Sequence, residues 1–170
     1  FPANVGGIIY AQHDKADFEK ASLMILLTFY VSFLGYMIFP AIGPRFTLAG
    51  QYLVDIKGLW FGNQLIDFLN QIEGPMKKNC FPSQHTGGSL IAIALLYTHN
   101  RKLFWSFLLW PTMIIWATIY LRYHYVVDIV AGAINATVAF WLAPYLIDRW
   151  EALSEESQII KDKVAQLWKV

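Results

Sequence analysis

The sequence predicts an all-α integral-membrane protein, and its composition and long apolar runs support this class. Of the 170 residues, 56% are hydrophobic and only 15% are charged, whereas a soluble domain carries about 25% charged residues. A bilayer-spanning helix needs about 20 mostly apolar residues, and several stretches approach this length. The net charge of +1 gives no general attraction to nucleic acid. A soluble protein with four buried helices is the alternative.

Four predicted transmembrane helices make up most of the chain. They cover residues 21–41, 87–98, 103–121 and 126–147. The second is short unless the polar residues 83–86 begin the same helix. Pro111 lies inside the third and is expected to kink it, because proline cannot donate a backbone hydrogen bond. The charged sequences HNRK after the second span and DRWE after the fourth are typical of membrane exits.

Three segments flank or interrupt this transmembrane core of residues 21–147. Residues 1–20 are expected on the cytoplasmic side, and residues 148–170 as a charged cytoplasmic tail helix. Residues 44–80 form an interfacial segment, in which the amphipathic stretch 59–69 predicts a helix lying in the membrane interface. Eight of the 13 Lys and Arg residues fall on the side of the N-terminus. The positive-inside rule therefore makes that side cytoplasmic.

Three polar groups fall together at the opposite, non-cytoplasmic boundary. Residues 43–45 (GPR) end the first span, residues 82–85 (PSQH) open the second, and residues 122–128 (RYHYVVD) join the last two. Charged groups at a membrane are costly unless they are paired or used, so this convergence predicts a functional site. The site would face the periplasm, the cell exterior or an organelle lumen.

His124 and Asp128 are four residues apart, a spacing that places both on one side of a helix. The carboxylate could then accept the imidazole N–H, fix the tautomer and stabilise a cationic ring. The other ring nitrogen would be free to attack or to take a proton. A purely structural His–Asp hydrogen bond is the alternative.

Ser83 follows Pro82 and is predicted to cap the second span. The amides of Gln84 and His85 would then point out of a helix N-terminus, which favours an anion. An ordinary capped helix is the alternative. His85, close to that N-terminus, is positioned to donate a proton to a leaving oxygen.

Arg45 and Arg122 are expected to hold phosphate oxygens bidentately, although arginines at an interface also bind lipid headgroups. A metal hydrolase needs three or more ligands, and two arginines would repel a cation. Cys80 is the single cysteine, which excludes a cysteine-based zinc site. The sequence therefore predicts an anion site without a metal, and no cofactor.

Two of these motifs resemble a known family. PSQH (82–85) and YLRYHYVVD (120–128) resemble the type 2 phosphatidic-acid phosphatase superfamily of membrane lipid phosphatases and phosphotransferases, over about residues 40–143. The resemblance implies a metal-independent helical enzyme that works through a phosphohistidine intermediate. It also implies a fold of six spans, of which this chain would hold the last four.

The resemblance assigns roles to individual residues. It implies His124 as nucleophile, Asp128 as its orienting partner and His85 as general acid, with Ser83 and Arg45 holding phosphate.

The chain departs from the family pattern at several positions. Gln84 stands where the family has Gly, and Ile38 and Phe46 replace a Lys and a Pro of the first motif. Ala117 and Thr118 replace a Ser-Arg pair. We hypothesise that Arg122 supplies the missing guanidinium and that Lys77 or Lys78 replaces the missing lysine.

The Gly-Pro-Arg and His-Tyr-Val-Val-Asp sequences resemble the branch that contains inositol phosphorylceramide synthases. The resemblance implies a lipid phosphatase or a phosphotransferase. Hydrolysis of a lipid phosphate and transfer of a phospho-headgroup to a polyol or lipid alcohol use the same residues, so both remain open. The expected partners are the membrane and a lipid phosphate or phospholipid. A membrane scaffold that binds headgroups is the non-enzymatic alternative.

Overall fold

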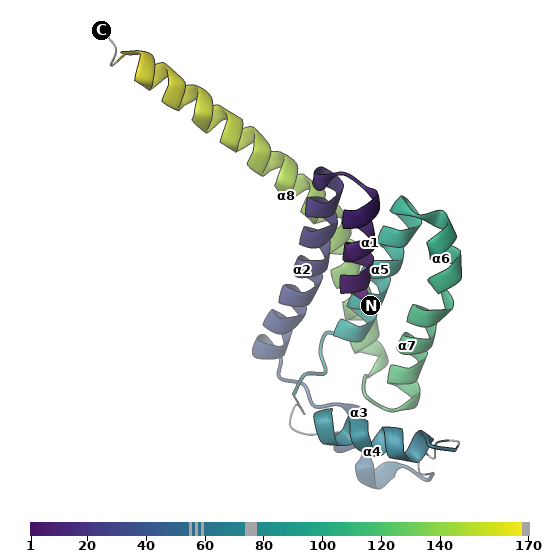
Figure 1. Ribbon diagram of the computed structural model, residues 1–170. Helices are drawn as coiled ribbons and strands as arrows, with labels where there is room; N and C mark the ends of the chain where they lie inside the picture. The colour runs from purple at the N-terminus through teal and green to yellow at the C-terminus, as the bar shows by residue number, and fades with distance from the viewer. Residues whose placement is uncertain (55, 57, 59, 74–77, 168–170) are drawn as a thin grey trace.

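Helices form the regular structure of the computed structural model, which describes residues 1–167 apart from positions 55, 57, 59 and 74–77. The fold class is therefore confirmed. Figure 1 shows α3 and α4 lying across one end of a helical bundle, while the C-terminal part of α8 projects from the other end. The helices are α1 (Pro2–Gln12), α2 (Lys15–Ile38), α3 (Pro44–Thr47), the 3-10 turn η1 (Ala49–Gln51), α4 (Gly62–Glu73), α5 (Gln84–His99), α6 (Arg101–Phe107), α7 (Leu109–Tyr120) and α8 (Val126–Leu167).

The core of the bundle lies around α5, which packs against α1, α2, α7 and α8. Leu95 and Leu96 on α5 are fully buried. Val5 and Ile9 on α1 are 1% exposed and join the same apolar cluster. Within residues 1–20, α1 is thus part of the packed bundle, a contribution that the sequence pattern did not predict.

Three helical stretches among the described residues are long and apolar enough to cross a membrane, where the sequence predicted four. They are Lys15–Ile38, Arg101–Tyr120 and Val126–Lys161. The difference lies in α5, which has 16 residues. At about 1.5 Å per residue it spans roughly 24 Å, less than the roughly 30 Å of a hydrocarbon core.

Proline breaks one predicted span and not another. The third span is divided at Leu108, between α6 and α7. Pro111 has no N–H for the carbonyl of Phe107 four residues earlier, so the helix is interrupted there. By contrast, α8 is one helix of 42 residues that passes through Pro144. The predicted tail helix therefore continues the fourth span without a break.

Candidate active site

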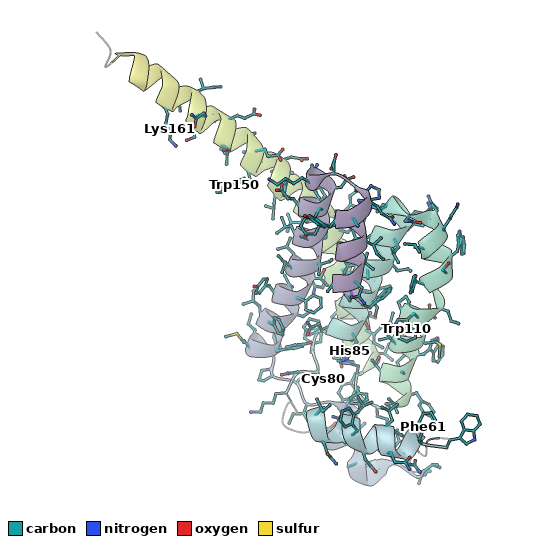
Figure 2. The ribbon with its side chains drawn as sticks, in the orientation of Figure 1. Phe61, Cys80, His85, Trp110, Trp150 and Lys161 are labelled. Atoms are coloured by element: carbon teal, nitrogen blue, oxygen red, sulfur yellow. The ribbon has the colours of Figure 1, made fainter. Side chains whose placement is uncertain are left out.

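Backbone hydrogen bonds tie the three polar loops together at the end of the bundle covered by α3 and α4. The amide of Arg45 donates to the carbonyl of Arg122 at 3.0 Å, and the amide of Ser83 donates to the carbonyl of Asp128 at 2.9 Å. Figure 2 shows Cys80 and His85 at this end of the bundle, far from Trp150 and Lys161. The loops before α3, before α5 and before α8 thus form one unit.

Glycines allow these loops to approach closely, since they have no Cβ. A Cβ at Gly132 on α8 would overlap the carbonyl oxygen of Ser83, and one at Gly43 would lie 2.7 Å from the carbonyl oxygen of Tyr123. The site therefore depends on the absence of side chains at these two positions.

His124 lies in the loop between α7 and α8. The amide of His124 donates to the carbonyl of Thr118 at 3.3 Å, and α8 begins only at Val126. The expectation that His124 and Asp128 share one helix is therefore wrong. Asp128 lies in the first turn of α8, and its Oδ2 accepts a hydrogen bond from the amide of Tyr125 at 2.7 Å. Their proximity comes from this turn.

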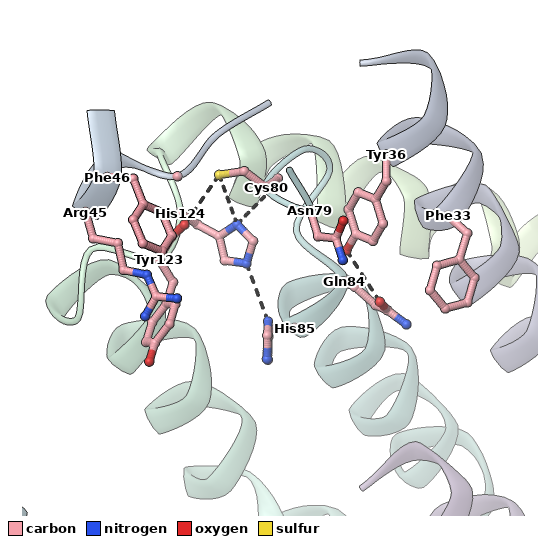
Figure 3. Close-up of a pocket in the computed structure, with 11 residues that line it drawn as sticks. Phe33, Tyr36, Arg45, Phe46, Asn79, Cys80, Gln84, His85, Tyr123 and His124 are labelled. Atoms are coloured by element: carbon pink, nitrogen blue, oxygen red, sulfur yellow. Dashed lines mark hydrogen bonds between the residues drawn. The ribbon is translucent and has the colours of Figure 1, made fainter. Parts of the chain in front are cut away.

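The imidazole of His124 is held from both sides. Its Nδ1 lies 2.9 Å from the carbonyl oxygen of Cys80 and 3.6 Å from Oδ2 of Asp128, so the carbonyl is the nearer acceptor. Its Nε2 lies 3.4 Å from Nδ1 of His85 (Figure 3). His124 is 6% exposed and Asp128 is 1% exposed. The buried ring thus has an acceptor on one nitrogen and a second histidine on the other.

A cavity of about 210 Å³ opens on this histidine pair. Figure 3 shows the pair between Arg45 on one side and Tyr36 with Gln84 on the other. The hydroxyl of Tyr36 donates to Oε1 of Gln84 at 3.4 Å. The cavity is lined by Phe33, Tyr36, Gly43, Arg45, Phe46, Asn79, Cys80, Gln84, His85, Tyr123 and His124.

The Arg45 guanidinium supplies positive charge to this cavity. It lies 4.1 Å from the ring centre of Tyr123 and 4.5 Å from that of Phe46. Its Nη1 donates to Oδ1 of Asn70 on α4 at 2.6 Å. These contacts orient the planar cation beside the histidines, where it can meet an anion.

The start of α5 supplies further positive potential. The side chain of Ser83 accepts a hydrogen bond from the amide of Thr86 at 3.3 Å, which confirms Ser83 as the N-cap. Ser83 is fully buried and does not line the cavity, whereas Gln84 and His85 do. Because the first amides of a helix lack partners within the helix, this end favours an anion.

The remaining predicted phosphate ligands lie elsewhere. Nη2 of Arg122 donates to the carbonyl of Val54 at 2.8 Å, and its guanidinium lies 3.5 Å from the ring centre of Tyr52. Arg122 and the exposed Lys78 are not among the cavity-lining residues. Lys77 falls outside the described part of the chain. The proposed replacement of family cations by Arg122 or Lys78 gains no support from this geometry.

Sequence analysis missed Cys80 as a member of the site. Its thiol donates to Oδ2 of Asp128 at 2.8 Å, and the side chain is 3% exposed. Burial and this hydrogen bond raise the pKa of the Cys80 thiol to about 12, so it stays protonated and remains a donor. The available signal in the sequence was that Cys80 directly precedes Phe81-Pro82-Ser83, the segment that leads into the predicted site.

Sequence analysis also passed over the aromatic and amide side chains that line the cavity. No short motif marks residues that reach the cavity from α2, α3 and separate loops. They are Phe33, Tyr36, Phe46, Asn79 and Tyr123.

The potential ligand atoms of Cys80, His124 and Asp128 all lie within 4.8 Å of one another, a spacing that also fits a cation. Hydrogen bonding accounts for this spacing, since the thiol donates to the carboxylate and a carbonyl lies at hydrogen-bonding distance from the ring Nδ1. We therefore assign no metal ligands here.

Apolar spanning helices, a histidine pair of which His124 is buried, a helix N-terminus and an arginine together define a membrane protein with an anion-receptive site. A family model described as the PAP2 superfamily matches residues 2–142. The chain therefore belongs to the PAP2 superfamily, whose members are lipid phosphatases and phosphotransferases. The resemblance seen in the motifs is confirmed.

A curated relative points to one branch of this superfamily. The chain is 33% identical over 89 residues to the inositol phosphorylceramide synthase catalytic subunit aur1 of Schizosaccharomyces pombe. The match covers 45% of this chain and 20% of the relative, so the chain spans about a fifth of that protein. No solved structure matches the chain.

Proposed function

We propose that this protein transfers the phospho-group of a membrane lipid through a covalent intermediate on His124. The observation that carries the proposal is the arrangement of the histidine pair at the cavity. Nε2 of His124 faces the cavity beside His85, while Nδ1 lies 2.9 Å from a carbonyl oxygen. A neutral ring with its proton on Nδ1 leaves Nε2 unprotonated, which is the nucleophilic form.

In the first step, Nε2 of His124 attacks phosphorus and the bond from phosphorus to the leaving oxygen breaks. His85 gives its proton to that oxygen. Arg45 and the first amides of α5 hold the phosphate oxygens. The negative charge of Asp128, 3.6 Å from the ring, stabilises the cationic phosphohistidine.

In the second step, an acceptor hydroxyl attacks the phosphorus atom and gives its proton to His85. The bond between phosphorus and Nε2 breaks, which restores both histidines. Water as acceptor gives hydrolysis, and an alcohol gives transfer. The same residues serve both reactions, so the acceptor side of the cavity decides between them.

Transfer to a polyol or lipid alcohol is the outcome that we favour. The cavity wall opposite Arg45 carries Phe33 and three neutral polar side chains, those of Tyr36, Asn79 and Gln84. Gln84 stands where the family has Gly. Neutral donors and acceptors suit a hydroxyl-rich headgroup without charge. The similarity to a subunit named for inositol phosphorylceramide synthesis points the same way. Hydrolysis is the second candidate.

We further propose that the site faces the periplasm, the cell exterior or an organelle lumen. The charge count along the sequence supports this orientation. Figure 1 shows the C-terminal part of α8 projecting at the end of the bundle opposite α3 and α4, and this arrangement supports the proposed orientation.

The decisive experiment follows a phosphate-labelled phospholipid in vesicles that contain the purified chain, with a chelator present. Added inositol or glycerol should receive the label, and vanadate should inhibit because it mimics the transition state of phosphoryl transfer. Release of inorganic phosphate alone would favour hydrolysis. Binding of lipid without any label transfer, unaffected by vanadate, would support a headgroup-binding scaffold instead.

Gln84→Gly provides the matched variant for the acceptor question, because it restores the residue of the family pattern. We expect the ratio of transfer to hydrolysis to fall severalfold, while total consumption of the lipid changes less. An unchanged ratio would show that the neutral wall does not select the acceptor.

A further inference from the structure

The structure assigns to Cys80 a positioning role in the His124 site: its carbonyl fixes the ring tautomer, and its thiol holds the Asp128 carboxylate away from the ring. This inference rests on the proposed role of His124 as nucleophile. Cys80 touches neither the phosphate nor the acceptor in that mechanism, and it acts through His124 and Asp128.

The first half of the inference follows from two distances. The carbonyl oxygen of Cys80 lies 2.9 Å from Nδ1 of His124, within the usual range for a hydrogen bond, whereas Oδ2 of Asp128 lies at 3.6 Å. A carbonyl can only accept, so Nδ1 must carry the proton. The backbone of Cys80 thus selects the tautomer that leaves Nε2 free.

The second half follows from the hydrogen bonds of the carboxylate. Oδ2 of Asp128 accepts from the Cys80 thiol at 2.8 Å and from the Tyr125 amide at 2.7 Å. Two donors on one oxygen reduce its availability to the imidazole. The carboxylate therefore stabilises positive charge on His124 by proximity, without taking over its N–H.

This balance matters because a closer carboxylate would favour the protonated ring. A protonated His124 has no free lone pair on Nε2 and cannot attack phosphorus. The other ionisable or charged groups that face the ring are His85 on α5, the Cys80 thiol and Arg45 on α3. Tyr36 on α2 lines the far side of the same cavity. Asp128 is the only carboxylate among the described residues facing the ring.

The test compares Cys80→Ala, which removes the donor, with Cys80→Ser, which keeps one. In Cys80→Ala we expect the acid limb of the kcat/KM profile to move to higher pH by roughly one unit, because the carboxylate approaches the ring. Cys80→Ser should restore the limb close to its original place. A purely structural role would lower activity at every pH without moving the limb.

Asp128→Asn provides the second arm, because Cys80 is proposed to act through Asp128. In the Asp128→Asn background, Cys80→Ala should leave the acid limb where it is, so the two effects should not add. An acid limb that does not move in Cys80→Ala, or that moves equally in both backgrounds, would overturn the inference.

A third measurement does not depend on activity. Cys80 is the single cysteine, so the S–H stretching band in the infrared spectrum belongs to it alone. Donation to a carboxylate weakens the S–H bond, and the band should lie at low frequency and rise in Asp128→Asn. A band unchanged by Asp128→Asn would refute the thiol contact. If the band shifts but no variant or wild-type protein turns over lipid, the proposed function fails and the thiol contact stands.

Discussion

The helix α5 has a histidine near each end, and each of these histidines faces a second one from another segment. His85 meets His124 with ring centres 5.7 Å apart, and His99 meets His13 at 5.0 Å. The surroundings differ. The first pair lies at the helix N-terminus and lines a cavity with Arg45, while His99 lies in the last turn, where the helix carbonyls carry negative potential.

Neither ring of the second pair is buried, whereas His124 of the first pair is. Nδ1 of His99 lies 2.9 Å from the carbonyl oxygen of Leu95 one turn back. His13 lies 3.5 Å from Asp17, whose side chain is 46% exposed. By contrast, both residues of the His124–Asp128 pair are buried. The two pairs therefore differ in the burial of one ring, in the adjoining cavity and in the potential at the helix end, although a backbone carbonyl lies 2.9 Å from a ring Nδ1 in both.

The largest expected difference between the two pairs concerns the nucleophile. His124→Gln should lower turnover by on the order of 10⁴-fold or more, because it removes the proposed nucleophile. His99→Gln should leave turnover close to that of the wild type. The assay is label transfer from phospholipid, with acid-labile labelled protein as a measure of the intermediate. If His124→Gln protein still became labelled, His124 would not be the residue that forms the intermediate.

A smaller loss is expected for His85→Gln, by roughly 10²- to 10⁴-fold, as for removal of a general acid. The loss should shrink for substrates with good leaving groups, which need no proton. The wild type should show a bell-shaped pH profile. The reaction needs an unprotonated Nε2 on His124 and a proton on His85, so turnover should fall at both extremes of pH. An equal loss for good and poor leaving groups would argue against proton donation by His85.

The two arginines provide the next comparison. Arg45→Ala should lower kcat/KM by roughly 10²-fold, since it removes the cavity-lining cation that we propose holds the phosphate. Arg122→Ala should cost much less, because its guanidinium is bound to the carbonyl of Val54. The measurement is the steady-state kcat/KM of both variants. A larger loss for Arg122→Ala would revive the hypothesis that it reaches the phosphate.

The smallest expected effect is on stability. Gly132→Ala places a Cβ against the carbonyl oxygen of Ser83 and should cost about 1–3 kcal/mol of stability. Gly7→Ala on α1, with nothing within 4 Å of the added carbon, is the matched control and should be neutral or slightly stabilising. Thermal unfolding in detergent measures both. Equal midpoints would show that the contact between α8 and the Ser83 loop is not tight.

The sequence predicted much of the fold and part of the site. Apolar runs predicted the helices that became α2, α6 with α7, and α8, because apolar length is a property of the chain itself. They did not predict α1, whose short segment is helical through packing of Val5 and Ile9 into the core. The Ser83 cap was predicted correctly because a cap depends on neighbouring residues only.

Placement of the site residues could be predicted less well. The spacing of His124 and Asp128 suggested one helix, whereas a turn brings them together. Arg45 and Arg122 were both expected to hold phosphate, yet of the two only Arg45 lines the cavity. Cys80 had no pattern of its own, and its contacts with Asp128 and His124 join residues more than 40 positions apart. Contacts between residues so far apart in the sequence form only when the loops pack together in the folded protein.

By itself, the sequence determined the helical class, the family and the motif residues, because composition, periodicity and local spacing are read along the chain. The tertiary structure decided which arginine faces the histidines and which acceptor lies nearest to Nδ1 of His124. It also decided which wall of the cavity carries uncharged side chains. These depend on the close approach of three loops at Gly43 and Gly132, and a distance between separate segments is set only when the helices pack.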